Sequence, residues 1–292
     1  MVKFNSKIII LTILSLCFTG LIFVGFYFYH QIPKNEEKKT HSSAPADLEF
    51  FETVFKFKKN ELNLSGKEVV AGIIPHHLLA ADLIAEFFYN LQEKKYNTIV
   101  LIGPNHFDAG DSGMITSAYG WQTPYGLLKV DDEILDKIPQ NIKVDEEAIK
   151  NEHSITSEVA FIKKIFPQAK FLPIILKSSV TPEEAEDLAH GLFDLSKNKK
   201  VLILASADFS HYKDSETAQK NDAESIRTLL DFDFGKVYGL DVDSPASIYA
   251  LLEYSRLNKA NFRLLNNSNS AILAGKPEIQ STTSYVTGYF IK

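Results

Sequence analysis

Short runs of mostly apolar residues recur along the chain from about residue 69 onward. They lie at Val69–Ile74, Thr98–Ile102, Phe171–Leu176 and Val201–Ala205. Because these runs lack the alternation of apolar and polar positions expected of a strand with one face in water, they predict strands that are buried on both faces.

Segments with helical periodicity separate these runs. They lie at Leu78–Leu91, Ser157–Ile165, Pro182–Leu195 and Ala218–Leu230. Strands that alternate with helices predict an α/β fold with a largely parallel central sheet flanked by helices on both faces. Residues Gly113–Val130 are candidates for additional antiparallel strands. Ser284–Ile291 predicts a last strand because β-forming residues dominate it.

The N-terminal segment has a different character. From Ile8 to Tyr29 the chain runs for 22 residues without a charge, which is about the ~20 residues that a helix needs to cross a bilayer. This predicts a transmembrane helix, and with it a single-pass protein of the cell membrane with an extracytoplasmic domain. A cleaved signal peptide is the alternative, although its apolar region is usually shorter, roughly 7 to 15 residues. The predicted organisation is an anchor in residues 1–30, a flexible polar tether in 31–46 and one α/β domain in 47–292.

Composition narrows the chemistry. The net charge of −6 argues against nucleic acid as a partner, and 45% hydrophobic residues are ample for a core. The only cysteine, Cys17, lies inside the N-terminal apolar stretch. A metal bound by the domain must therefore be held by nitrogen and oxygen atoms.

Histidines follow three of the predicted strands. His76 and His77 come after Val69–Ile74, His106 after Thr98–Ile102 and His211 after Val201–Ala205. A single histidine in such a loop is most simply explained by a hydrogen bond to the backbone. Three at equivalent positions are different, because ligands bind beyond the carboxyl ends of parallel strands and imidazole is the commonest metal ligand. The pattern predicts a metal or proton-transfer site there.

Two further residues are candidates for the same crevice. His153 lies in a turn that also starts a helix, with Ser154 available as its cap. Asp208, three residues before His211, could bind a metal or could orient an imidazole. His190 lies inside a helical pattern, where an exposed or otherwise satisfied histidine is expected.

Seven short segments carry a family resemblance through their order along the chain. They are Gly72-Ile73-Ile74-Pro75-His76, Gly103-Pro104-Asn105-His106, Thr123-Pro124-Tyr125-Gly126 with Val130-Asp131, Glu152-His153-Ser154-Ile155, Ser206-Ala207-Asp208-Phe209-Ser210-His211, Asn267-Ser268-Asn269-Ser270 and Val286-Thr287-Gly288-Tyr289. In these residues the chain resembles the Memo family, whose prokaryotic members are called AmmeMemoRadiSam system protein B. That family is similar in fold to the class III extradiol dioxygenases. The resemblance spans most of residues 68–292, and each segment alone is weak.

The resemblance implies a metal held by two histidines and a later cysteine. The histidines correspond to His76 and His106. This chain departs at the cysteine, whose place is best occupied by Asp243. Two histidines and one carboxylate are typical of non-haem Fe(II) centres, so Fe(II) is the expected cofactor, with Cu, Zn or Mn as alternatives. The other interpretation is that loss of the thiolate left a degraded site.

The resemblance also implies lining groups, which correspond to His153, Asp208 and His211. Two other departures could mark an altered substrate: His77, where the family commonly has a small residue, and Thr156, where it usually has glutamate.

The expected function is that of a metal-dependent oxidoreductase acting on a small molecule. In this hypothesis the metal-binding residues hold Fe(II), His153 and His211 move protons or hold oxygen intermediates, and Asp208 orients its neighbours. A second hypothesis is a non-catalytic metal- or peptide-binding interaction module, for which the name of the family's system implies AMMECR-type and radical SAM partners. A third is a metal-dependent hydrolase, in which the same ligands would activate water.

Overall fold

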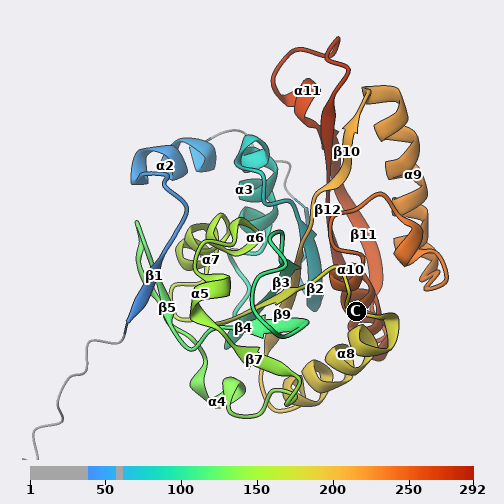
Figure 1. Ribbon diagram of the computed structural model, residues 1–292. Coiled ribbons are helices and arrows are strands. Elements are labelled where there is room, and N and C mark those ends of the chain that lie inside the picture. Colours follow the sequence, from blue (N-terminus) through green and yellow to red (C-terminus); the bar gives the residue numbers. More distant parts are fainter. Residues whose placement is uncertain (1–38, 57–61) are drawn as a thin grey trace, which may run out of the picture. The chain divides into compact units, whose positions relative to one another are not determined.

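Most of the fold is built on a nine-stranded sheet. The computed structural model describes residues 39–56 and 62–292, and the compact unit runs from Lys39 to Lys292. The strand order is β10-β12-β2-β9-β3-β8-β4-β7, with β11 paired to β12 outside this path, and a three-stranded sheet has the order β1-β5-β6 (Figure 1).

The elements follow one another along the chain. The strands are β1 (Thr40–Ser42), β2 (Val69–Ile74), β3 (Thr98–Pro104), β4 (Met114–Thr116), β5 (Gly120–Thr123), β6 (Gly126–Leu128), β7 (Ile142–Val144), β8 (Lys170–Leu176), β9 (Val201–Ser206), β10 (Phe209–Lys213), β11 (Asn261–Asn269) and β12 (Thr282–Ile291). The helices are α2 (Leu48–Lys56), η1 (Leu78–Ala80), α3 (Ala81–Asn90), α4 (Asp132–Leu135), α5 (Glu146–Ile149), α6 (His153–Thr156), α7 (Val159–Ile165), α8 (Pro182–Ser196), α9 (Ser215–Asp231), η2 (Val237–Gly239), α10 (Pro245–Leu257) and α11 (Ser270–Leu273).

The sheet is mixed, so the prediction of a largely parallel sheet is wrong. The four central strands β2, β9, β3 and β8 pair in parallel, as does β4 with β7. Antiparallel pairs join β12 to β2, β10 and β11, and β4 to β8. The late strands cause the difference. After α10, β11 and β12 form an antiparallel pair that adds to the edge of β2, and no helical crossover is needed between antiparallel neighbours.

Helices cover both faces of the central strands (Figure 1). Alternate residues of β3 and β9 enter different cores: Val100 and Ile203 belong to the one with α8 and α10, while Ile99 and Leu202 belong to the one with α2, α3 and α7. Every residue of β2, β3 and β9 is buried. This explains why the apolar runs show no alternation.

The membrane part of the predicted fold class, and the single-pass membrane localisation that followed from it, are contradicted. In the part of the chain that the structure describes, no helix has the length and apolar character needed to cross a bilayer. The longest there, α9, has 17 residues, short of the ~20 required. The predicted span, Ile8–Tyr29, lies outside the described residues.

Part of the segment predicted as a tether has regular structure. Thr40–Ser42 form β1, which pairs in parallel with β5. His41 is buried there and its Nε2 lies 2.7 Å from Glu146 Oε2. Further along, the backbone N–H of Ala44 donates to the carbonyl of Thr156. Residues 40–44 therefore lie against the segment that contains α6.

Candidate metal centre

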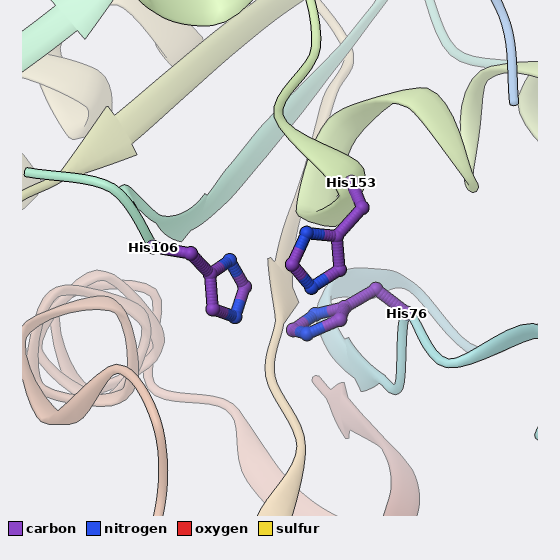
Figure 2. A group of neighbouring side chains, drawn as sticks. All are labelled: His76, His106 and His153. Carbon is purple, nitrogen blue, oxygen red and sulfur yellow. The ribbon is translucent and has the colours of Figure 1, made fainter. Parts of the chain in front are cut away.

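Three imidazoles meet beyond the carboxyl ends of the parallel strands. His76 follows β2, His106 follows β3 and His153 is the first residue of α6 (Figure 2). The ring centroid of His76 lies 5.1 Å from those of both His106 and His153. Close packing of β3 against α6 helps to place them, because a Cβ added at Gly103 would lie 2.7 Å from Ser154 Oγ.

Asp243 brings a carboxylate to the same point. Its Oδ2 lies 3.2 Å from His76 Nε2 and 3.7 Å from His106 Nε2. Atoms that bind one ion through bonds of about 2.0–2.2 Å lie roughly 3–3.5 Å apart. The distance from Asp243 to His76 lies in this range and the distance to His106 is slightly longer, so a small movement of His106 would let the carboxylate and both rings share a cation. We call Asp243 Oδ2 and the two Nε2 atoms the acceptor triad. Asp243 Oδ1 is buried and has no hydrogen-bond partner among the described residues, as expected of a carboxylate whose partner is an ion.

Hydrogen bonds fix the tautomer of His76. The Ser206 hydroxyl donates to the carbonyl of Ser154 at 2.7 Å, so it can only accept from His76 Nδ1, which lies 3.1 Å away. In the neutral ring the proton is therefore on Nδ1, and the Nε2 lone pair faces Asp243. A buried partner on the far nitrogen is the usual arrangement for a metal-binding histidine.

Glu152 does the same for His106, and the sequence analysis did not identify this role. Its Oε1 lies 2.7 Å from His106 Nδ1, while its Oε2 accepts from the backbone N–H of His106. The carboxylate also caps α6 through the N–H of Ser154. Burial raises the pKa of Glu152, but the contacts with His106 outweigh it and lower the net value. The position of Glu152 beside His153 in the sequence places a carboxylate near the site. The sequence does not predict that this carboxylate contacts His106.

The histidines and carboxylates around the triad shift one another's pKa. Burial lowers the pKa of His76, but Asp208 and Asp243 outweigh it and raise the net value. Burial also lowers the pKa of His106, but the contacts of this ring with Asp243 and Glu152 outweigh burial and raise its pKa to about 9. Burial raises the pKa of Asp243, and the histidines reverse this and lower it. The pocket thus favours positive charge between these groups, which a proton or a metal ion can supply.

Asp208 supports the site from the loop after β9. Its Oδ1 accepts from the backbone N–H of His76 at 3.1 Å, and its Oδ2 lies 3.7 Å from His76 Nε2. Its backbone N–H donates to Asp243 Oδ2, and its carbonyl accepts from the backbone N–H of Asp243. Burial raises the pKa of Asp208. The suggestions that it binds metal and that it orients its neighbours are both compatible with this placement.

His153 differs from the other two histidines. Its ring stacks on His106 with centroids 3.9 Å apart and planes 24° apart. A metal ion lies in the plane of an imidazole that binds it, so two rings stacked in this way cannot share one ion without rotating. The ligand atoms of His76, His106 and His153 do lie within 4.8 Å of one another, but the stacking favours Asp243 over His153 as the third ligand. Burial lowers the pKa of His153 to about 4.

A cleft of about 790 Å³ opens beside the triad. Its lining contains all six predicted site residues, together with His77 and Thr156, the two other positions at which the chain departs from the family pattern. It comprises Ala44, Pro45, His76, His77, Leu78, His106, Asn151, His153, Thr156, Ser157, Asp208, His211, Tyr212, Asp243 and Thr283. His211 is therefore brought to the same cleft, although it belongs to neither of the two groups here whose ligand atoms lie within 4.8 Å of one another. These groups are His76, His106 and His153, and His76, Asp208 and Asp243. His77 Nδ1 lies 2.7 Å from the buried Tyr285 hydroxyl.

Two other features are less suited to metal chemistry. Glu186, His190 and Glu253 bring ligand atoms together between α8 and α10, but Glu253 already accepts two hydrogen bonds from Arg256. A larger cavity of about 1060 Å³ lies at the other ends of the central strands. It is lined by seven lysines, and its lining includes no histidine among the described residues. We therefore place the chemistry in the histidine cleft.

Comparison with known proteins supports the family assignment. The model of the family described as Memo-like protein matches residues 40–289. A MEMO1 family protein of Desulfurococcus amylolyticus is 30% identical over 232 residues, which cover 74% of this chain and 80% of the relative. Another, from Nitrosopumilus maritimus, is 26% identical over 240 residues, covering 77% and 85%. The chain is an α/β protein with a candidate metal-binding cleft. It belongs to the Memo family, as the resemblance predicted.

Similarity to solved structures is weaker. The crystal structure of the uncharacterized protein JW3007 from Escherichia coli K12 aligns with 75% of this chain and 99% of its own length, at 12% identity and a TM-score of 0.45. A likeness of this size carries no argument about function.

Proposed function

We propose that this chain is a metal-dependent oxidoreductase that binds a divalent cation through His76, His106 and Asp243, with Fe(II) as the cation. The observation that supports this most is the acceptor triad, in which Asp243 Oδ2 lies 3.2 and 3.7 Å from the Nε2 atoms of His76 and His106, while the other ring nitrogens are hydrogen-bonded to Ser206 and Glu152. Two imidazoles and one carboxylate are the ligand set of non-haem Fe(II) enzymes that use dioxygen.

A bound cation would polarise a substrate oxygen, and iron would also exchange electrons with it. The chain's own groups have separate tasks in this proposal. Burial lowers the pKa of His153 to about 4, so at neutral pH its ring is uncharged and can accept a hydrogen bond from a substrate hydroxyl. His211 lies in the same cleft and can hold a polar substrate atom. Asp208 positions His76 through the backbone N–H of that residue.

Metal analysis tests the first half of the proposal. The full chain would be purified without oxygen and its metals measured by mass spectrometry. We expect about one iron per chain, lost in His106→Ala and kept in the control His190→Ala, which alters the group between α8 and α10. Iron retained by His106→Ala and lost from His190→Ala would place the metal elsewhere and overturn the assignment.

Oxygen uptake tests the second half. The iron-loaded chain would be mixed with a panel of phenolic substrates and, separately, with reductants, while dissolved oxygen is recorded. We expect uptake that depends on iron. Metal binding without oxygen uptake in any mixture would favour the non-catalytic binding module, and hydrolysis of model esters or amides without oxygen uptake would favour the hydrolase.

A further inference from the structure

Strand β10 forms one wall of the cleft and pairs irregularly with β12. Phe209 lies opposite Ser284, His211 opposite Thr283 and Lys213 opposite Thr282, with register shifts on both sides of His211. Two residues of β10 thus stand against each single residue of β12, which is the signature of a β-bulge repeated in succession. Bulges next to active sites commonly redirect a side chain.

The bulges have a direct consequence for the cleft. His211 and Tyr212 are consecutive, yet both line it, whereas neighbours in a regular strand point to opposite faces. Tyr212 reaches this position with a φ of 57°. For a residue with a side chain this left-handed conformation costs roughly 1–2 kcal/mol.

Packing does not explain why this conformation is adopted. Tyr212 is 82% exposed. Its ring lies 6.0 Å from the His211 ring, measured between centroids. Phe209, three residues earlier on the same strand, is fully buried. A strained backbone that presents an unburied aromatic ring to a cleft is more simply explained by binding than by folding.

We propose that Tyr212 and His211 form a recognition wall that binds the flat, conjugated part of a substrate whose polar end reaches the acceptor triad. This inference rests on the proposed metal site. The exposed face of a tyrosine ring suits offset stacking on another π-system, and the His211 imidazole beside it offers a hydrogen bond to a substituent. A cleft of about 790 Å³ lies within the range of small-molecule sites.

Two chelators separate recognition of the ring from recognition of the metal. Benzohydroxamate and acetohydroxamate bind a cation through the same group and differ in the substituent, which is a phenyl ring in the first and a methyl group in the second. Each would be titrated calorimetrically into the full chain loaded with Zn(II), which does not turn over. We expect benzohydroxamate to bind about 5- to 10-fold more tightly, as stacking worth about 1 kcal/mol implies.

Variants assign that preference to the wall. We expect Tyr212→Ala to abolish the preference while acetohydroxamate binding changes less than about twofold, and Tyr212→Phe to retain it. The matched control is Phe107→Ala, since Phe107 is 70% exposed and does not line the cleft; it should leave the preference unchanged. An equal preference in Tyr212→Ala and the unmodified chain would overturn the proposal.

Failure of the wall and failure of the metal site are distinguishable. If neither chelator binds a chain that retains zinc by elemental analysis, the recognition wall is refuted and the metal site stands. If zinc itself is not retained, both proposals fall.

Discussion

Two pairs among the five histidines that line the cleft differ in how they are held. His76 and His106 each have Nδ1 bonded to a buried group, Ser206 or Glu152, at 3.1 and 2.7 Å. His153 Nδ1 lies 3.4 Å from Glu152, and half of its side chain is exposed. His211 lies on a bulged strand. Position after a strand brings a histidine to the cleft, as it does His77, whose Nδ1 also lies 2.7 Å from a buried hydroxyl. The candidate ligands are the histidines whose Nε2 in addition lies close to Asp243, at 3.2 Å for His76 and 3.7 Å for His106.

Among the variants that test this comparison, removal of the Asp243 carboxylate should have the largest effect on metal affinity. We expect Asp243→Ala to weaken Zn(II) binding by more than roughly 100-fold, about 3 kcal/mol, because it removes one ligand and the negative charge between two imidazoles. Competition with a fluorescent chelator would measure it. Affinity close to that of the unmodified chain would exclude Asp243 from the ligand set.

Removal of a partner rather than a ligand should have a smaller effect. Glu152→Gln keeps the shape of the side chain but weakens its hold on His106, and we expect a loss of about 10- to 100-fold in Zn(II) affinity. The corresponding control is Glu146→Gln, because Glu146 contacts His41 and does not line the cleft. Equal losses in the two variants would show a general effect of charge.

The pH dependence of the metal-free chain tests the electrostatic side. The pKa of His106 is about 9 in the folded state and near 6.5 in an unfolded chain. The folded state binds this proton more tightly, so the stabilisation is fully present below pH 6.5 and is lost as the pH rises through 9. Thermal unfolding would be measured with a chelator present. Between pH 6.5 and 9 the Tm of the unmodified chain should therefore fall more steeply than the Tm of His106→Gln. Parallel curves would contradict the shift.

The smallest effect is expected at His153. Because its ring stacks on His106 and cannot share an ion with it in this orientation, His153→Ala should change Zn(II) affinity by no more than about twofold, in line with other substitutions at exposed sites. A loss similar to that of Asp243→Ala would instead make His76, His106 and His153 the ligand set.

The sequence predicted the central fold and the site to different depths. The apolar runs coincide closely with β2, β3, β8 and β9, since burial on both faces leaves a strong pattern. Strand β11, Asn-Phe-Arg-Leu-Leu-Asn-Asn-Ser-Asn, was not predicted because most of its positions are polar and only partly buried. The antiparallel addition of β11 and β12 therefore could not be anticipated, and the sheet was predicted to be more parallel than it is.

At the site, the strand-end rule anticipated that His76, His106 and His211 would share a cleft. It could not anticipate Glu152 as the partner of His106, because the contact joins residues 46 apart in the chain. Nor could it anticipate Tyr212, since a strand pattern would turn that side chain away from His211. Both depend on tertiary geometry that a local pattern does not encode.

The hydrogen bonds of the Ser206 hydroxyl also connect separate parts of the site. It joins His76 to the carbonyl of Ser154, and the Ser154 hydroxyl in turn donates to the carbonyl of Pro104, two residues before His106. The segment after β2, the ends of β3 and β9 and helix α6 are thus joined by hydrogen bonds that do not depend on an ion. Such a preorganised site has little freedom to adapt its bond lengths, so it should select ions whose bonds to nitrogen and oxygen match its spacing. Among divalent ions of similar size, the supply of each metal in the cell would decide which one is bound.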